Sequence, residues 1–336
     1  MQQLTFVARG RVEFREVAEP ALDSEEGAIV RPIASTTCDL DRAIIAGRTP
    51  FEGPFAIGHE CVAEVVEAGS RSGVEPGVSV VVPWHPCCTE CPTCRRGLTA
   101  HCERVRRFAM YGLPLGGDLG GFFDDLVYVP FGRALVPLPN GVRAECVASA
   151  SDNLTDAYGA VVRSLRGRPG LSVLVLGGTG SIGQWAAGWA VVLGADRVVY
   201  ADDDAEGNRT AAAYGAATIA DLSELTSDAP FDVLIDASGH AKLLAEAIAH
   251  VAPGGHCHSV GIYFAERTGL PLGAMYMNAI SFTTGRPSVA PLLPEVLGAV
   301  AEGRLDPAPV FSERLRYDQA PEALAEIPRK ALFTRA

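Results

Sequence analysis

The stretch Leu171–Asp204, LSVLVLGGTGSIGQWAAGWAVVLGADRVVYADDD, decides the fold of this chain of 336 residues. An apolar run typical of a buried strand leads into Gly178-x-Gly180-x-x-Gly183, and an Ala-rich segment typical of a helix follows. The first glycine permits a tight turn, the second lets the backbone approach a pyrophosphate, and the third lets helix and strand pack closely. This pattern predicts a parallel sheet whose first βα turn binds the phosphates of a dinucleotide.

The same stretch also indicates which dinucleotide is bound. Amides at the predicted helix start, at Ser181 and Ile182, lie at the positive end of the helix dipole and suit a phosphate. A second strand-like run, RVVYAD, ends at Asp202, where a carboxylate can accept hydrogen bonds from both ribose hydroxyls. Because a carboxylate there repels a 2′-phosphate, we expect NAD and not NADP. The other interpretation is an ordinary βα turn rich in glycine.

Two sequence textures divide the chain. Residues 1–152 carry short β-rich runs separated by Gly and Pro, such as CVAEVVEAG and VSVVVP, which predict a largely antiparallel β domain. Residues 153–286 alternate apolar strand-like runs with Ala-rich helical ones, which predicts a doubly wound parallel sheet and an α/β fold. Residues 287–336 are too few for a domain, and we expect them to pack back onto the first one.

Composition excludes several classes of protein. The 28 Lys and Arg against 40 Asp and Glu give a formal net charge of −12, so nucleic acid is a poor candidate partner. No apolar run approaches the ~18 residues needed to span a membrane. The opening MQQLTFVARG lacks the pattern of a signal peptide. We therefore expect a cytoplasmic protein whose nine cysteines do not form disulfides.

Five of the nine cysteines lie within residues 87–102. Four of them have the spacing Cys88-x2-Cys91-x2-Cys94-x7-Cys102, in which short gaps turn consecutive thiolates onto one ion and the longer gap closes a tetrahedron. The stretch has too few apolar residues to fold without such a staple. The spacing predicts a structural zinc lobe over about residues 84–104, and the alternative is a redox cluster or loose thiols. Cys87 does not fit the spacing.

Further motifs appear before this lobe: Cys38 follows a strand-like run, and Gly58-His59-Glu60 precedes another. With the four-cysteine lobe and the dinucleotide fingerprint, in this order, they make the chain resemble the zinc-dependent medium-chain dehydrogenases of the alcohol and polyol dehydrogenase superfamily. The resemblance covers essentially the whole length. It implies a GroES-like catalytic domain, a Rossmann domain and a homodimer or homotetramer.

The resemblance further implies a second, catalytic zinc held by Cys38, His59 and Asp152, with one position left open for substrate. Glu60 corresponds to an acid that lies close to this metal and is a possible further ligand. Asp41 matches the position that hydrogen-bonds the ligating histidine. The other interpretations are a helix N-cap for Asp152 and a buried ion pair for Glu60 and Asp41.

Leu40 departs from the family pattern, because most members carry a Ser or Thr there whose hydroxyl passes the substrate proton toward solvent. Asp156, one helical turn after Asp152, or an ordered water is a candidate for this role, and the alternative is a solvated helix carboxylate. The resemblance also places the nicotinamide carboxamide at Val260, Ile262 and Thr284. It places an apolar substrate pocket at Leu40, Phe51 and Trp84, for which core packing is the alternative.

The expected reaction is hydride transfer between a primary or secondary alcohol, or its aldehyde or ketone, and NAD, with two zinc ions per chain. One rival is conjugate reduction of an enal or enone, a reaction that does not need the hydroxyl absent at Leu40. The other rival is a zinc and nucleotide binder without catalytic activity, which would have no need of an open metal site.

Overall fold

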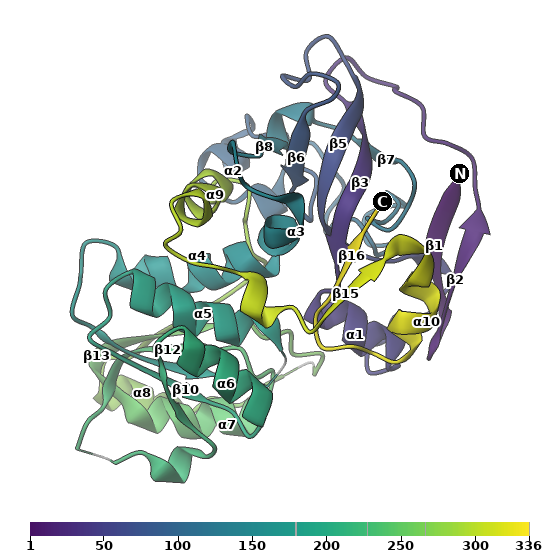
Figure 1. The fold of residues 1–336 in the computed structure, drawn as a ribbon. Coiled ribbons are helices and arrows are strands. Elements are labelled where there is room, and N and C mark those ends of the chain that lie inside the picture. Colours follow the sequence, from purple (N-terminus) through teal and green to yellow (C-terminus); the bar gives the residue numbers. More distant parts are fainter. Residues whose placement is uncertain (179, 227, 266, 336) are drawn as a thin grey trace. The chain divides into compact units, whose positions relative to one another are not determined.

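The computed structural model describes residues 1–178, 180–226, 228–265 and 267–335. They form two compact units, the first made of residues 1–155 and 288–336 and the second of residues 156–287. Figure 1 follows the chain through both units.

A six-stranded parallel sheet forms the second unit, in the order β11-β10-β9-β12-β13-β14. Numbered along the chain, the strands lie in the order 3-2-1-4-5-6 of a doubly wound dinucleotide-binding sheet, which confirms the predicted α/β class. Its strands are β9 (Ser172–Leu176), β10 (Arg197–Ala201), β11 (Ala217–Ile219), β12 (Phe231–Asp236), β13 (Val251–Ser259) and β14 (Ser281–Thr284).

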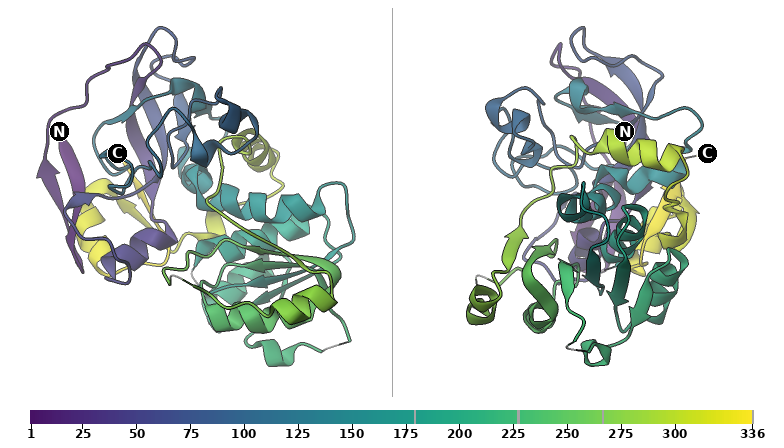
Figure 2. Two further views of the ribbon diagram at one scale, coloured as in Figure 1. Left: turned by 180° about the vertical axis from the view of Figure 1, so that it is seen from behind. Right: turned by 90° about the vertical axis from the view of Figure 1, so that its left-hand side faces the viewer.

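Helices connect these parallel strands. They are α5 (Ser181–Val192), α6 (Ala205–Ala213), α7 (Ala241–Ala247) and α8 (Leu272–Met277), with short 3-10 turns at Leu222–Glu224 and Ile248–His250. The chain moves outward from β9 to β11 and, in the opposite direction, from β12 to β14. Because such crossovers are right-handed, the two sets of helices lie on opposite faces of the sheet; Figure 2 shows helices on either side of the strands.

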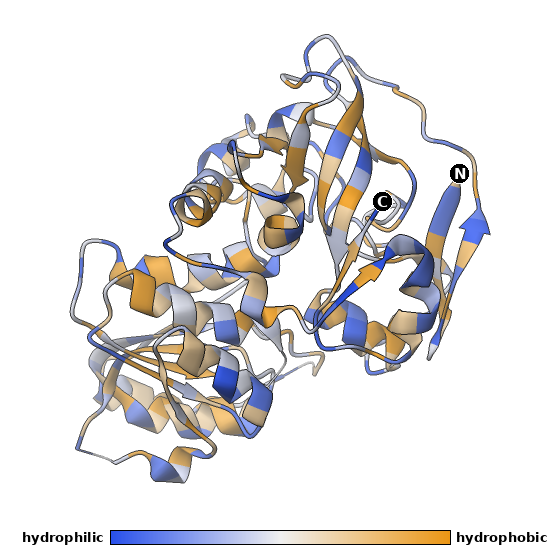
Figure 3. Ribbon diagram, viewed as in Figure 1, coloured by the Kyte–Doolittle hydropathy of each residue, from blue (hydrophilic) through white to orange (hydrophobic). Residues whose placement is uncertain are grey.

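The central strands of this sheet carry continuous apolar runs, residues 173–176 in β9 and 233–235 in β12, and Figure 3 colours the chain by hydropathy. In β9 and β12 the runs of Val, Leu and Ile are buried with no polar alternation, because helices cover both faces of the sheet. The carboxyl ends of all six strands meet at one edge. That edge is the place where a sheet of this kind binds its ligand.

The first unit contains two sheets that are mostly antiparallel. In the larger one the order is β15-β16-β3-β5-β6-β8, with β7 also paired to β3, and in the smaller one it is β2-β1-β4. Their strands are β1 (Gln2–Ala8), β2 (Arg11–Glu16), β3 (Ala28–Thr36), β4 (Phe55–Ala56), β5 (Glu60–Ala68), β6 (Ser79–Val82), β7 (Val127–Val129), β8 (Val136–Pro137), β15 (Glu313–Arg316) and β16 (Ala331–Thr334).

The end of the chain completes the larger sheet of this unit. β16 pairs antiparallel with β3, so that Leu332 lies opposite Thr36. The helices of the unit are short: α1 (Asp39–Ile45), α2 (Pro92–Arg95), α3 (Ala144–Val147), α9 (Leu293–Ala301) and α10 (Ala320–Ala325). A longer helix, α4 (Asn153–Leu165), begins in the first unit and continues into the second. Within the described parts of the chain, no helix is long and apolar enough to cross a bilayer.

Candidate active site

Three potential zinc ligands come together where β3 and β5 lie side by side in the first unit. β3 ends at Thr36, opposite Glu60 at the start of β5, so Cys38 and His59 are brought to the same end of the strand pair. Asp152 follows a 3-10 turn at Ala148–Ser151. The hydroxyl of Ser151 donates to the carbonyl of Cys61 and accepts from its amide, at 2.7 and 2.8 Å, which holds that turn against β5.

The ligand atoms of Cys38, His59 and Asp152 lie within 4.8 Å of one another, and all three side chains are buried. Asp152 Oδ2 is 3.3 Å from Cys38 Sγ and 3.5 Å from His59 Nε2. A thiol, an imidazole and a carboxylate are the donor types of catalytic zinc sites that keep one position open. The three residues therefore fit a zinc ion, and their role as its ligands stays a prediction.

The electrostatics of this group favour a cation. Burial raises the pKa of the Cys38 thiol well above its ordinary value, and the carboxylates of Asp152, Glu60 and Asp41 raise it further. Burial lowers the pKa of His59, but Asp41 and Asp152 outweigh this and raise it to about 9. A divalent ion would displace these protons and neutralise the buried anions, which is the usual linkage between metal binding and proton release.

Asp41 lies beside the ring of His59, but the hydrogen bond that the resemblance implies is not formed, since neither Asp41 Oδ1 nor His59 Nδ1 has a hydrogen-bond partner within the described residues. Its Oδ1 is 3.5 Å from His59 Nδ1, while its Oδ2 accepts a 2.9 Å hydrogen bond from the amide of Cys38. One carboxylate thus contacts both the ring of His59 and the backbone of Cys38. A carboxylate beside Nδ1 favours the tautomer in which Nε2 is free to bind a metal.

Glu60 is not part of the three-residue group but forms a buried ion pair. Its Oε1 accepts hydrogen bonds from the hydroxyl of Ser149 at 2.6 Å and the amide of Asn153 at 2.9 Å, and its Oε2 lies 2.5 Å from Lys330 Nζ. The structure therefore favours the ion-pair interpretation of Glu60 over that of a further ligand. Lys330 was not identified from the sequence, although it is one of only two lysines and directly precedes the apolar strand β16.

Replacing Lys330 by methionine should lower the free energy of unfolding by about 3 to 5 kcal/mol, because it leaves the buried carboxylate of Glu60 without its counter-charge. Urea denaturation measures the effect. The matched control is Lys242→Met, which changes the exposed lysine of α7 and should leave the midpoint unchanged. Equal midpoints for the two variants would show that the ion pair does not stabilise the fold.

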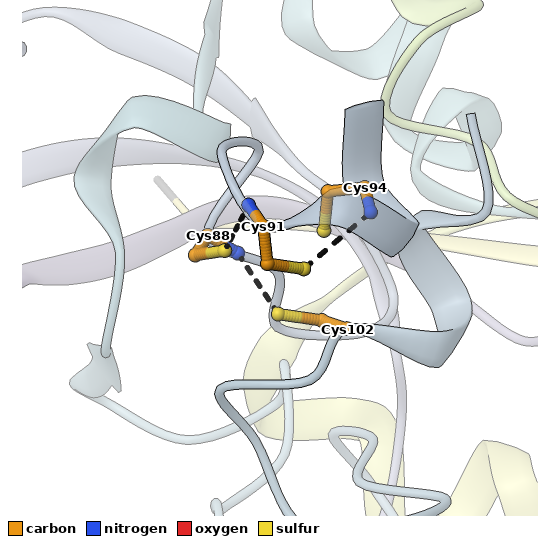
Figure 4. A group of neighbouring side chains, drawn as sticks. All are labelled: Cys88, Cys91, Cys94 and Cys102. Atoms are coloured by element: carbon orange, nitrogen blue, oxygen red, sulfur yellow. Dashed lines mark hydrogen bonds between the residues drawn. The ribbon is translucent and has the colours of Figure 1, made fainter. Parts of the chain in front are cut away.

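The four predicted lobe cysteines also converge, as Figure 4 shows. Ligand atoms of Cys88, Cys91, Cys94 and Cys102 lie within 4.8 Å of one another. Amide N–H groups point at the sulfurs: Cys91 N to Cys88 Sγ at 3.3 Å, Cys94 N to Cys91 Sγ at 3.4 Å and Cys88 N to Cys102 Sγ at 3.3 Å. Such donors stabilise thiolates, so the lobe fits a structural zinc ion.

Cys87 lies beside this lobe but outside the four-cysteine group. Burial raises the pKa of its thiol to about 12, so it stays protonated at neutral pH. For Cys91, burial acts upward, but the amides of Glu103 and Cys94 lower the pKa of its thiol to about 6. None of the nine cysteines, all of which fall within the described residues, forms a disulfide.

The predicted cofactor residues lie at the carboxyl edge of the parallel sheet in the second unit. Gly178 and Gly180 follow β9 with φ values of 117° and 142°, a region that favours glycine, and α5 begins directly afterwards at Ser181. Asp202 follows β10 and is 9% exposed. Val260 and Ile262 follow β13, and Thr284 ends β14 opposite Ser259.

The residues predicted to line the substrate pocket and to carry the proton lie in the core of the first unit or in α4. Trp84 is 4% exposed and belongs to the core of the first unit, and Leu40 and Phe51 pack against that core. Asp156 lies in the first turn of α4. Asp152 precedes that helix, with φ −148° and ψ −91°, so the expected placement of both aspartates on one helix face is wrong. A pocket lined by the three apolar residues and a proton-carrying role for Asp156 stay predictions.

Comparisons with known proteins agree with both units. A family model described as alcohol dehydrogenase GroES-like domain matches residues 24–140, and one described as zinc-binding dehydrogenase matches residues 181–289. Among solved structures, alcohol dehydrogenase TADH from Thermus sp. ATN1 is 31% identical with a TM-score of 0.91, and the alignment covers 100% of each chain.

Two curated relatives are similar over most of their length. The Mycobacterium tuberculosis protein named a probable zinc-binding alcohol dehydrogenase is 29% identical over 97% of this chain and 85% of its own. The NADP-dependent isopropanol dehydrogenase of Thermoanaerobacter brockii is 29% identical over 81% of this chain and 78% of its own. Given the fold, the two candidate metal sites and these matches, the chain belongs to the zinc-dependent medium-chain dehydrogenase/reductase family and is an alcohol dehydrogenase-like oxidoreductase.

Proposed function

We propose that this protein transfers a hydride between a primary or secondary alcohol, or the corresponding aldehyde or ketone, and NAD. The observation that carries the proposal is the buried group of Cys38, His59 and Asp152, whose donor atoms lie within 4.8 Å of one another. Three protein donors of these types leave a position for substrate, whereas the four cysteines of the lobe close theirs. A zinc ion bound there would supply Lewis acidity toward the substrate oxygen.

Other residues of the chain are proposed to position the zinc ligands and to bind the cofactor. Asp41, whose carboxylate lies 3.5 Å from His59 Nδ1, is proposed to orient that ring, and Lys330 neutralises the buried carboxylate of Glu60. Gly178, Gly180 and the amides that begin α5 form the proposed seat for the cofactor pyrophosphate. Asp202 is proposed to accept hydrogen bonds from the ribose hydroxyls.

Proton transfer must differ from the usual family scheme, because Leu40 has no hydroxyl and packs against the core. We infer that Asp156 or a water molecule carries the proton instead. The same observation supports a second candidate, the conjugate reduction of an enal or enone, in which the proton goes to carbon and needs no hydroxyl at this position. A saturated aldehyde or ketone as product, with no interconversion of simple alcohols, would identify that reaction.

The cofactor preference gives the test of the proposed function. In a screen of alcohols, polyols and aldehydes that follows NADH or NADPH absorbance, we expect kcat/KM with NAD to exceed that with NADP by about 100-fold. A like charge beside the 2′-phosphate costs several kcal/mol, and each 1.4 kcal/mol corresponds to a factor of about ten. The comparison of NAD with NADP is informative because one relative of this chain is named an NADP-dependent isopropanol dehydrogenase. A preference for NADP would contradict the role assigned to Asp202.

We further infer a cytoplasmic homodimer or homotetramer. Nine cysteines without a disulfide among them, five of which are proposed zinc ligands, support a reducing compartment. Family membership supports the oligomer, whose state sedimentation measurements on the full chain would determine.

A further inference from the structure

Tyr200 lies fully buried at the end of β10 and has no role in the function described so far. Asp202 follows β10 directly, two residues after Tyr200. The hydroxyl of Tyr200 donates a 2.6 Å hydrogen bond to Asp202 Oδ2. The phenol of Tyr200 therefore holds the carboxylate that is proposed to bind the ribose.

Glycines from three elements make the space for this pair. A Cβ atom at Gly177, directly after β9, would lie 2.2 Å from the Tyr200 hydroxyl oxygen and 2.4 Å from Asp202 Oδ2. A Cβ at Gly183 in α5 would lie 3.2 Å from the Tyr200 ring, and one at Gly207 in α6 would lie 3.2 Å from both polar atoms. Only Gly183 belongs to the dinucleotide fingerprint. A side chain at position 177 would clash with the Tyr200–Asp202 pair. This pair, and not the phosphate loop, therefore requires glycine at position 177.

The hydrogen bond also acts on the charge of Asp202. Burial raises the pKa of its carboxyl group, and the neighbouring carboxylates of Asp204 and Asp203 act in the same direction. The hydroxyl of Tyr200 and the amide of Asp204, which donates to Oδ1 at 3.1 Å, oppose this shift. One donor therefore holds each oxygen. A carboxylate has about four acceptor sites, which leaves capacity for two ribose hydroxyls.

We propose that Tyr200 is a positioning residue for cofactor specificity: its hydroxyl holds the carboxylate of Asp202 in the orientation that accepts the adenosine ribose diol and rejects a 2′-phosphate. This inference rests on the proposed use of NAD. It assigns the selectivity to Tyr200 in β10 together with Asp202 directly after that strand, supported by a glycine outside the fingerprint, instead of to Asp202 alone.

The test compares Tyr200→Phe with Tyr276→Phe, which removes the hydroxyl of a tyrosine that is 85% exposed on α8 of the same unit. Dissociation constants of NADH and NADPH are measured by titration of their fluorescence, without turnover. For Tyr200→Phe we expect the NADH constant to rise about tenfold and the NADPH constant to stay the same or fall. In turnover, KM for NAD should rise with little change in kcat. Tyr276→Phe should match the parent protein in all four quantities.

The variant Asp202→Asn distinguishes a failure of the proposed use of NAD from a failure of the role proposed for Tyr200. If the parent protein prefers NADPH and Asp202→Asn leaves the ratio of the two constants unchanged, the proposed use of NAD is wrong. If Asp202→Asn shifts the ratio but Tyr200→Phe does not, the proposed function stands and the role of Tyr200 is overturned. A Tyr200→Phe chain that fails to fold, judged by its melting temperature beside that of Tyr276→Phe, would show that the hydroxyl serves the fold, and would also overturn it.

Discussion

Replacing Cys38 by alanine should lower kcat/KM for alcohol oxidation at least about a thousandfold while the chain stays folded. A Lewis-acidic metal contributes several kcal/mol of stabilisation to the transition state, and each 1.36 kcal/mol is a factor of about ten in rate. The variant keeps only His59 and Asp152 of the three proposed ligands. Two protein ligands are too few to hold a catalytic zinc ion. Initial rates under saturating cofactor measure the effect.

The control for this variant is Cys146→Ala, which removes a partly buried thiol of α3 outside both metal groups. It should keep the activity of the parent protein within about a factor of two, as expected for a site without a special mechanism. If Cys38→Ala retained more than about a third of the parent activity, the three-residue group would not be the catalytic centre.

Replacing Cys102 by serine should remove the structural ion and lower the melting temperature by roughly 10 °C or more. Metal binding by such lobes contributes on the order of 10 kcal/mol of folding free energy in small zinc domains, and 1 kcal/mol corresponds to about 2 to 4 °C in a domain of 150 to 250 residues. The lobe has little else to stabilise it, because its buried apolar cluster consists mainly of the cysteines themselves. Differential scanning calorimetry in the absence of added zinc measures the shift.

Cys87→Ala is the matched control, since it changes a buried cysteine of the same lobe that lies outside the four-residue group. Loss of this small buried group should shift the melting temperature by only a few degrees. If Cys102→Ser and Cys87→Ala melted at the same temperature, the four cysteines would not hold a structural ion.

Sequence reasoning was most reliable where the deciding interactions are local. The glycine fingerprint occupies a single strand–turn–helix, so its residues need no distant partner to form the turn, and β9 and α5 lie where we predicted them. The same holds for the cysteine lobe, whose four members lie within fifteen residues of one another, from Cys88 to Cys102. In both cases spacing along the chain is enough to indicate the chemistry.

Interactions between distant residues were harder to predict. Lys330 meets Glu60 across 270 positions of sequence, and no pattern near either residue indicates the other. The pair forms because β16 returns to β3. Similarly, β1 and β2 form a hairpin in which Gly10 takes a φ of 69°. The short strands β4, β8 and β11 have too few residues to show a period.

The candidate catalytic group shows most clearly which contacts cannot be predicted from sequence spacing. Residues 38, 59 and 152 lie far apart in the sequence, and only the resemblance to a known family connected them. The structure brings their donor atoms together, and it also shows what the resemblance did not: Glu60 is paired with Lys330, and Asp152 precedes α4 instead of lying in it.

The zinc content per chain, measured by inductively coupled plasma mass spectrometry on protein purified without added metal, tests the central claim most directly. The two proposed metal centres predict two zinc ions in the parent protein, one in Cys38→Ala and one in Cys102→Ser. One zinc ion per chain in the parent protein, or two in Cys38→Ala, would contradict the assignment of Cys38, His59 and Asp152 as a zinc site.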